Sequence, residues 1–361
     1  MAVRSKNTLD CYLMDRPGAL RLGPRPIPIL APGQILLRTV SVSICATDVA
    51  YWRGLATPDA PWPIVPGHEY IGELVDAHGA VPGMKIGDLV TYWGQTDFDG
   101  LAEFRAISPV TSSTDQQDFY TNRHFCDATG AAVAVVPRAI PLHLAPLAEP
   151  LTAVLRLLYS YPPEPGDRVA VLGAGTCGLL AIQALRALGC GEIVVLEVDP
   201  YRRQLARQLG AESVFDPGNG GAEIDRLERD TQGDAVDMVI DLLPDIGGLP
   251  GEHVRSMAMR LLRPGGKYLL YGAPEGPQPL NHWLVLSKGL QLLAAGFDMR
   301  RFPMWRTAAV LRSALRMLES GIVDPAPLVT NVIKFGDLDE VNEAFANHAR
   351  DNRMKTAVLF D

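Results

Sequence analysis

The second half of the chain alternates between short apolar runs and segments that repeat apolar residues at helical spacing. A short, wholly apolar run is typical of a parallel strand that is buried on both faces, and the longer periodic segments are typical of helices. The predicted strands cover residues 169–172, 192–197, 236–241 and 267–272, and the predicted helices cover 177–188, 200–209 and 252–262. This alternation predicts a doubly wound parallel sheet, so the expected class is α/β.

The first hundred residues follow another pattern, in which short β-type runs are separated by proline and glycine. Such punctuation favours a coiled, barrel-like β domain over a parallel sheet. The runs lie at residues 20–22, 34–42, 70–75, 88–92 and 102–107. A polar stretch at residues 111–130 has neither period and is expected to form a long loop.

The final residues return to amphipathic helices, at 305–320 and 338–348, and end in a strand at 355–360. We expect this segment to belong to the β-rich part of the chain. The predicted organisation is a first domain of residues 1–154, completed by 298–361, and a dinucleotide-binding domain of residues 155–297.

Three glycines separate the first predicted parallel strand from its helix. In this strand-to-helix context, Gly173 would make the tight turn, Gly175 would let the backbone approach a pyrophosphate, and Gly178 would let helix and strand pack closely. The helix N-terminus then presents free N–H groups to the anion. An ordinary strand-to-helix turn of another α/β domain is the alternative. We interpret the motif as a dinucleotide site.

An acid follows this turn at the distance that the motif requires. Glu197 ends the next predicted strand, nineteen residues after Gly178, and would accept hydrogen bonds from the adenosine ribose. Its charge would repel a 2′-phosphate, so NAD is favoured over NADP, although Arg202 and Arg203 could still reach a phosphate. Thr176 and Cys177 would lie beside the pyrophosphate, which backbone N–H groups bind, and no redox role is assigned to Cys177.

Composition narrows the class of protein further. The 361 residues carry a net charge of −8, which argues against nucleic acid as a main partner because phosphate binding needs a basic surface. The N-terminus lacks a signal-peptide core, and no apolar run approaches the roughly 18 residues that span a bilayer. Five scattered cysteines without a C-x-x-C pair fit a reducing cytoplasm. We expect no membrane partner and a cytoplasmic location.

Four possible metal ligands stand in the β-rich region. Cys45 follows a predicted strand, His68 and Glu69 lie in a turn that leads into another, and Glu149 precedes a proline. A thiolate, an imidazole and a carboxylate from separate elements match a catalytic zinc with three protein ligands and an open fourth position. Sequence spacing alone is weak support, because a lone cysteine is often a buried hydrophobe and a Gly-His pair is often part of a turn.

Together these motifs resemble those of the zinc-dependent medium-chain dehydrogenases of the alcohol dehydrogenase superfamily, and within them the sorbitol and polyol dehydrogenase branch. The resemblance runs from about residue 10 to 361, apart from the loop at 111–130. It implies a GroES-like catalytic domain and a Rossmann domain. The matching motifs, in order, are Cys45-x-Thr47-Asp48-x-x-Tyr51-Trp52, Gly67-His68-Glu69, Gly87-Asp88-x-Val90, Gly100-x-Ala102-Glu103-Phe104, Glu149-Pro150-Leu151 and the turn at 173–178.

The resemblance implies that Cys45 and His68 are zinc ligands. It leaves open whether Glu69 or Glu149 is the direct carboxylate ligand. It also implies that Thr47 takes the proton from the substrate hydroxyl and that Asp48 orients the ligands.

The chain departs from the family pattern in two places. Many relatives continue the proton path with a histidine where this chain has Ala50, so the proton would leave by another route. The stretch between Val90 and Gly100 lacks the four cysteines of a structural zinc, so only one zinc is expected.

The expected activity is hydride transfer between NAD(H) and the secondary alcohol or ketone of a polyol, sugar or cyclitol. A zinc-independent quinone or enone reductase of the same superfamily is one alternative, and a non-catalytic NAD-binding protein is another. The apolar run at residues 290–297 is expected at a sheet edge, where pairing with a second copy would give a homodimer or homotetramer.

Overall fold

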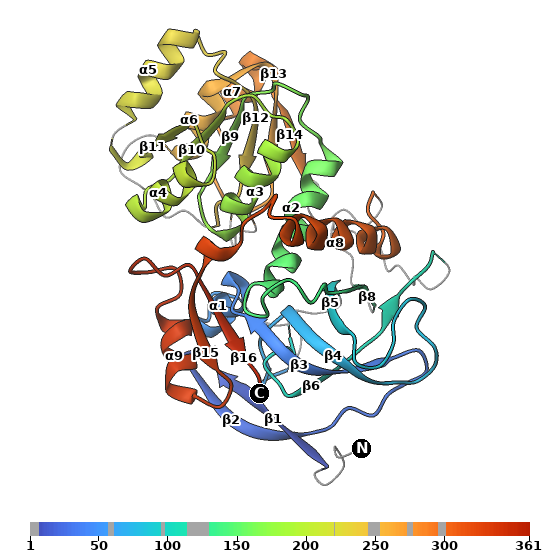
Figure 1. The fold of residues 1–361 in the computed structure, drawn as a ribbon. Helices are drawn as coiled ribbons and strands as arrows, with labels where there is room; N and C mark the ends of the chain where they lie inside the picture. The colour runs from blue at the N-terminus through green and yellow to red at the C-terminus, as the bar shows by residue number, and fades with distance from the viewer. Residues whose placement is uncertain are drawn as a thin grey trace. The chain divides into compact units, whose positions relative to one another are not determined.

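The fold is taken from a computed structural model of the chain, which describes residues 7–56, 61–94, 98–113, 130–219, 221–244, 253–272, 277–294 and 301–361 (Figure 1). The chain divides into two compact units. The first comprises Met1–Thr152 and Asp298–Asp361, and the second comprises Ala153–Phe297. Most of the polar stretch at 111–130 lies outside the described residues.

The first unit is built on β-strands that form two sheets. One sheet pairs β1 with β2, and the larger sheet has the order β15-β16-β3-β4-β5-β8-β7, with β6 also paired to β3. The strands are β1 (Thr8–Arg16), β2 (Ala19–Pro26), β3 (Ile35–Ser43), β4 (Glu69–Ala77), β5 (Leu89–Gly94), β6 (Phe104–Ile107), β7 (Pro109–Val110), β8 (Ala131–Val135), β15 (Val329–Lys334) and β16 (Lys355–Leu359).

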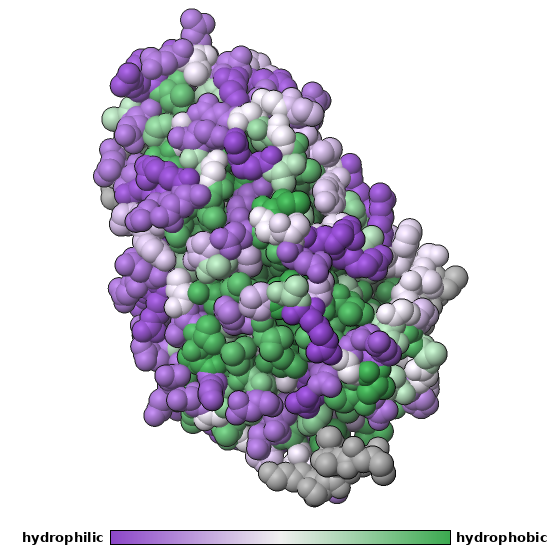
Figure 2. All heavy atoms as spheres, in the orientation of Figure 1, coloured by the Kyte–Doolittle hydropathy of each residue, from purple (hydrophilic) through white to green (hydrophobic). Residues whose placement is uncertain are grey.

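Hydrophobic alternation explains how these strands enclose a core. In β3, Ile35, Leu37 and Thr39 are buried, and the residues that alternate with them are only half-buried, as the period of two in a pleated strand requires. The aromatic residues Tyr12, Tyr70 and Tyr92 fill the interior of the unit. On the face drawn in Figure 2, apolar atoms also gather on the surface of this unit, between polar side chains.

The described residues of the first unit also include the helices α1 (Ala46–Trp52), α8 (Met304–Glu319) and α9 (Leu338–Ala346). The amphipathic α8 packs against β5 and β8, and α9 packs against β2. The last strand, β16, runs antiparallel to β3 and places Ala357 opposite Ser43. The start of β16, at Lys355, therefore lies beside the end of β3.

The second unit contains a six-stranded parallel sheet with the order β11-β10-β9-β12-β13-β14. Its helices lie against this sheet, as Figure 1 shows. The strands are β9 (Val169–Leu172), β10 (Ile193–Leu196), β11 (Ser213–Phe215), β12 (Val236–Asp241), β13 (Leu262–Leu270) and β14 (Gln291–Ala294). The helices are α3 (Thr176–Ala187), α4 (Pro200–Gln208), α5 (Ala222–Thr231), α6 (Val254–Leu261) and α7 (His282–Lys288), and α2 (Ala148–Ser160) crosses the boundary between the units.

The predicted α/β class is confirmed: a GroES-like β unit accompanies a doubly wound parallel sheet. The sequence pattern missed several elements, namely β1, β7, β8, β11, β15, α1, α5 and α7. Strand β11 has only three residues, and α5 is mostly charged, with one buried residue, Ile224, so neither presents a long apolar period. Within the described residues, no helix has both the length and the apolar character needed to cross a bilayer.

Candidate functional site

Asp48 joins the two segments that carry the predicted metal ligands. Cys45 follows β3 and caps α1, and its backbone N–H donates to Asp48 Oδ2 at 2.9 Å. The other oxygen, Oδ1, accepts the backbone N–H of Gly67 at 2.7 Å, in the turn that leads into β4. Because Asp48 is wholly buried, water does not compete for these bonds, and the two segments are fixed relative to each other.

Three of the predicted ligands lie together. The ligand atoms of Cys45, His68 and Glu69 all fall within 4.8 Å of one another. His68 and Glu69 are buried, whereas Cys45 keeps part of its surface accessible. A thiolate, an imidazole and a carboxylate are donors that bind zinc, and three protein donors are the number found in catalytic zinc sites. The donor set therefore fits a catalytic zinc.

His68 lies between two groups that can stabilise its charged form. Its Nδ1 is 3.7 Å from Asp48 Oδ1, and Cys45 is the other neighbour. Burial by itself would lower the pKa of His68, but the Cys45 thiolate and the Asp48 carboxylate outweigh burial and raise that pKa well above the usual value. An acid beside the second ring nitrogen is also the arrangement that orients a metal-binding histidine.

Glu69 has partners on both carboxylate oxygens. Ser43, its cross-strand neighbour, donates its hydroxyl to Oε2, and Lys355 donates its ammonium to Oε1. Lys355 also donates to the carbonyl of Ile44 at 3.1 Å. All three side chains are buried, so Lys355 balances a carboxylate charge that would otherwise be costly in this environment.

Sequence reasoning did not identify Ser43 or Lys355 as part of this site. The only signals were a lysine at the start of an otherwise apolar terminal strand and a serine two residues before Cys45. Lys355 is 286 residues away from Glu69 along the chain, so local spacing could not connect them. The antiparallel pairing of β16 with β3 brings them together.

Glu149 is not one of the three residues whose ligand atoms are grouped. It lies in the first turn of α2 and is half-buried, and the grouped ligand atoms of the described residues do not include its carboxylate. Its charge nevertheless acts on the buried phenol of Tyr92 in β5. Burial chiefly raises the pKa of Tyr92 to about 12, and Glu149 adds to that rise while Arg105 and His68 oppose it. Of the two acids left open by the sequence, the structure groups Glu69 with Cys45 and His68.

Thr47 lies next to the cluster, in the first turn of α1. Its Oγ1 is 3.9 Å from Cys45 Sγ, and the side chain is half-buried. Ala50, one turn further along α1, supplies no proton-transferring group. Any proton that Thr47 accepts must therefore leave by a path that does not use residue 50.

The predicted dinucleotide turn joins β9 to α3. Gly173 has φ +86°, in the left-handed region, where a side chain would be strained. A Cβ at Gly178 would overlap the carbonyl oxygen of Gly173, whereas a Cβ at Gly175 would meet nothing within 4 Å. Gly178 is thus needed for the packing of this unit, and Gly175 leaves open space above the N-terminus of α3. Thr176 and Cys177 form the half-buried start of that helix.

Glu197 is held in place by the backbone of the same site. Its Oε2 accepts the N–H of Ala174 at 2.7 Å, and its Oε1 accepts the N–H of Asp199 at 2.9 Å. Asp199 in turn caps α4 by accepting the N–H of Arg202 at 2.9 Å. The acid is therefore fixed beside the glycine turn.

Arg203 is engaged elsewhere. Its guanidinium is 3.0 Å from Asp216 Oδ2 and donates to the carbonyls of Glu197 and Val198 at 3.0 and 2.6 Å. A guanidinium bound in this way is occupied, which weakens the possibility that Arg203 receives a 2′-phosphate.

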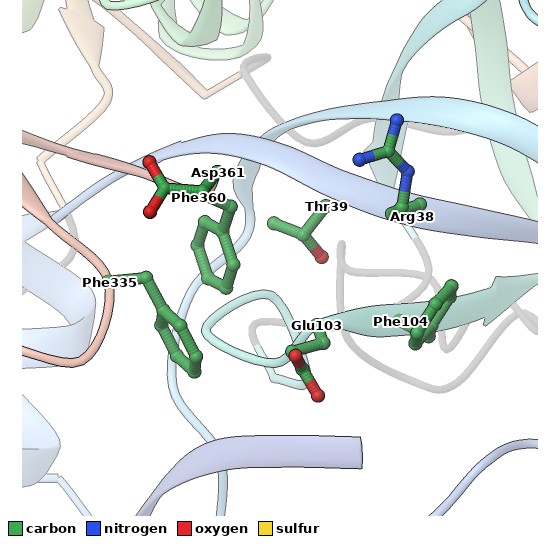
Figure 3. Close-up of a pocket in the computed structure, with 7 residues that line it drawn as sticks. All are labelled: Arg38, Thr39, Glu103, Phe104, Phe335, Phe360 and Asp361. Carbon is green, nitrogen blue, oxygen red and sulfur yellow. The ribbon is translucent and has the colours of Figure 1, made fainter. Parts of the chain in front are cut away.

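A separate hollow of about 240 Å³ lies on the first unit, and none of the predicted site residues lines it (Figure 3). Phe335 and Phe360 stack there with ring centroids 4.2 Å apart, and Arg38 reaches its rim while paired with Glu73. The hollow opens beside Thr39 in the middle of β3, whereas Cys45 follows the end of that strand. It is thus distinct from the metal-ligand cluster.

Comparison with known proteins agrees with this geometry. The model of the alcohol dehydrogenase GroES-like domain matches residues 31–108, and that of the zinc-binding dehydrogenases matches residues 176–314. The L-threonine 3-dehydrogenase of Pyrococcus abyssi is 26% identical over 340 residues, which cover 88% of this chain and 89% of that protein. The sorbitol dehydrogenase of Bacillus subtilis is 24% identical over 344 residues, which cover 90% and 89%.

The fold has solved counterparts. The 2R,3R-butanediol dehydrogenase of Bacillus subtilis superimposes with a TM-score of 0.75 at 21% identity, over 97% of this chain and 99% of the other. This likeness shows the common fold. Both family models and the relatives point the same way as the metal-ligand cluster and the dinucleotide turn: the chain belongs to the zinc-dependent medium-chain dehydrogenases of the alcohol dehydrogenase superfamily.

Proposed function

We propose that this chain is an NAD-dependent zinc dehydrogenase that interconverts a secondary alcohol and a ketone on a polyol, sugar or cyclitol. The observation that carries the proposal is the grouping of Cys45, His68 and Glu69 in a chain whose second unit also holds the glycine turn and a fixed acid at Glu197. The first feature suits an alcohol oxygen, and the second suits a nicotinamide cofactor.

In this proposal one zinc is held by Cys45, His68 and Glu69, and Glu149 is the remaining candidate ligand. A zinc bound there would supply Lewis acidity toward the substrate oxygen. Asp48 fixes the segments that carry Cys45 and His68 relative to each other, and Lys355 and Ser43 fix the carboxylate of Glu69. The protein thus presents its donors already arranged.

Thr47 is the proposed acceptor of the proton from the substrate hydroxyl. Its Oγ1 lies beside Cys45, and a hydroxyl both accepts and donates hydrogen bonds, so it can pass a proton on. With Ala50 next along the helix, we propose that water or a cofactor ribose hydroxyl continues the path.

The cofactor in this proposal is NAD. The backbone N–H groups at Gly175, Thr176, Cys177 and Gly178 would bind the pyrophosphate, and Glu197 would accept the ribose hydroxyls. The charge of Glu197 disfavours a 2′-phosphate, and Arg203 is already paired with Asp216. Arg202 remains a candidate for cofactor contact.

The substrate class rests on the donor set and on relatives. Two of the relatives are named for sorbitol, a polyol, and for L-threonine, a hydroxy amino acid. We favour a polyol, sugar or cyclitol because one thiolate donates less charge to zinc than two do, which leaves a stronger Lewis acid for a hydroxyl-rich substrate.

One experiment tests the proposal. The purified protein is assayed for metal content, and the absorbance of reduced nicotinamide is followed with NAD or NADP and a panel of polyols, sugars, cyclitols, L-threonine and simple secondary alcohols. The same absorbance is followed with NADH or NADPH and a panel of enones and quinones. We expect one zinc per chain and turnover with NAD and a polyol-type substrate. Full activity in protein stripped of metal would overturn the zinc chemistry. Turnover confined to enones or quinones would instead support the alternative, a zinc-independent reductase.

We also propose that the chain is a homodimer or homotetramer. Strand β14 is at the edge of the sheet with Leu292 39% exposed, and the preceding helix exposes Trp283 by 71% and Leu286 by 75%. Exposed apolar side chains beside an open strand edge are normally covered. Pairing of β14 with its copy across a two-fold axis would cover them. Light scattering at micromolar concentration should give at least twice the chain mass, and a monomer would contradict this proposal.

A further inference from the structure

A buried ion pair lies at the end of a central strand of the second unit. Asp241 is the last residue of β12, and its Oδ2 accepts the Nε–H of Arg255, in the first turn of α6, at 2.6 Å. Their exposures are only 2% and 3%. Such a pair stabilises a fold little, because desolvation of both charges offsets much of their attraction. Its presence therefore calls for another explanation.

The ion pair fixes Leu243 through hydrogen bonds to its backbone N–H and to its backbone carbonyl. Asp241 Oδ1 accepts the N–H of Leu243 at 3.1 Å, and Arg255 Nη2 donates to the carbonyls of Leu243 and Pro244, both at 3.2 Å. The remaining arm, Nη1, donates to Gln278 Oε1 at 2.7 Å. The guanidinium thus joins the loop after β12 to the segment that follows β13.

This loop lies at the switch point of the sheet. Strand β9 is followed by crossovers to one side and β12 to the other, and the two are neighbours, with Asp241 opposite Leu172. In sheets of this type, ligands bind outside the carboxyl ends of the two strands that flank the switch point. Leu172 leads directly into Gly173, and Asp241 is followed by residues 242–244, so these residues face the dinucleotide site from the side of β12.

Leu243 itself contacts the glycine turn. A Cβ placed on Gly173 would come within 2.8 Å of Leu243 Cδ2, and a Cβ on Gly272 would overlap the carbonyl oxygen of Leu243. Both glycines are needed because Leu243 stands between the turns that follow β9 and β13. A shift of Leu243 would therefore alter the space available at the turn.

Arg255 also neutralises the charge of Asp241. The carboxylate of Asp241 lies at the end of the strand next to β9, beneath the place where an anionic pyrophosphate would bind. A bare carboxylate there would repel that anion. Tyr268 donates its hydroxyl to Asp241 Oδ2 at 3.0 Å, which leaves Arg255 as the cation in contact with the acid among the described residues.

We propose that Arg255, anchored by Asp241, is a positioning residue for the dinucleotide site: it fixes Leu243 against Gly173 and neutralises the acid beneath the bound anion. The inference rests on the proposed cofactor function. Lysine would not replace arginine fully, because a single ammonium cannot reach a carboxylate, two carbonyls and an amide oxygen with the fixed fork of a guanidinium.

The first test compares Arg255→Met with Arg263→Met by titration with NADH, followed by fluorescence. Arg263 is the matched control, because its Nε pairs with Asp237 Oδ1 at 2.7 Å in the same strand β12, near the opposite end of the sheet. We expect roughly tenfold or greater loss of NADH affinity in Arg255→Met and little change in Arg263→Met. Equal affinity in the two folded variants would overturn the proposal.

Three further variants separate charge, shape and folding. Arg255→Lys keeps the charge and should recover part of the affinity. The double variant Asp241→Asn with Arg255→Met removes both charges, but it also removes groups that fix Leu243. Its affinity for NADH should therefore remain lower than that of the unmodified chain. Leu243→Ala leaves the ion pair intact and should weaken binding several-fold. Full affinity in the double variant and in Leu243→Ala would refute the positioning role, even if Arg255→Met failed to fold.

The outcome is distinguishable from a failure of the proposed function. Circular dichroism and zinc content report whether each variant is folded and whether the cluster at Cys45 is intact, and neither measurement involves the cofactor. If the unmodified chain binds neither NADH nor NADPH, the proposed function fails. If it binds NADH and all variants bind equally, only the inference about Arg255 fails.

Discussion

The two candidate sites of this protein are built in opposite ways. The metal-ligand cluster uses side chains from distant parts of the chain, with Cys45, His68 and Glu69 joined by Lys355 from the last strand. The dinucleotide turn uses a short continuous segment in which backbone N–H groups and the absence of side chains matter, and the carboxylate of Glu197 is bound to its backbone. A site made of side chains fails when a donor is removed, whereas a site made of backbone fails when a side chain is added.

The largest effect is expected at the donors. Cys45→Ser and His68→Ala should each lose the bound zinc and lower turnover by about 1,000-fold or more, because Lewis acid stabilisation of several kcal/mol is lost. Metal analysis and steady-state kinetics measure both. The strands that carry these donors remain paired, so NADH binding should persist. Undiminished turnover in either variant would show that the cluster is not catalytic.

The next effect separates two glycines of one turn. Gly178→Ala places a Cβ on the carbonyl oxygen of Gly173, and backbone cannot move aside cheaply, so we expect about 3 kcal/mol of destabilisation. Gly175→Ala meets no atom within 4 Å and should cost about 1 kcal/mol or less.

Gly175→Ala should lower the affinity for NADH strongly, although its effect on the free energy of unfolding is small. Its Cβ would stand where a pyrophosphate approaches, so NADH affinity should fall roughly tenfold or more while the fold is kept. Thermal unfolding and NADH titration of both variants provide the comparison. Tight NADH binding by Gly175→Ala would show that the turn does not hold the cofactor.

A smaller effect is expected at Glu197. Glu197→Ala should weaken NAD binding roughly tenfold to a hundredfold, which is the effect of losing hydrogen bonds to a charged acceptor. It should also reduce the preference for NAD over NADP. It also leaves the N–H groups of Ala174 and Asp199 without their acceptor. Glu197→Gln is the matched variant, since it keeps the size and removes the charge. The ratio of kcat/KM for the two cofactors is the readout, and an unchanged ratio in both variants would remove the ribose role.

The smallest effect concerns thiol reactivity. Burial chiefly raises the pKa of Cys11 and of Cys190 to about 11. A raised pKa means less thiolate, so at pH 8 only about one in a thousand of these thiols is reactive, and labelling should increase as pH rises toward 11. Cys45 and Cys177 are half-buried and should react first with iodoacetamide. Mass spectrometry locates the labels, and zinc should protect Cys45 while NADH protects Cys177. Rapid labelling of Cys11 or Cys190 at pH 8 in folded protein would contradict the assigned burial.

The sequence by itself determined the parallel sheet, the glycine turn and the acid that follows it. Those features depend on local periodicity and on a motif with fixed spacing, and β9, α3 and β10 lie where the pattern placed them to within a residue or so. Strand β11 and helix α5 were not predicted, because β11 is too short and α5 too polar to show a hydrophobic period. The sequence also singled out Cys45, His68, Glu69 and Glu149 by their donor types. Their spacing is weak support, and the resemblance to a family left the choice between Glu69 and Glu149 open.

Only the tertiary structure decided which side chains meet. Strand pairing places Ser43 opposite Glu69 and brings Lys355 to the same carboxylate, and it groups Glu69 rather than Glu149 with Cys45 and His68. In the second unit it joins Asp241 to Arg255 across the loop that flanks the glycine turn. These contacts link residues that are far apart or in different elements. They arise from the order and register of strands, which are set by packing of the whole core and not by any local pattern.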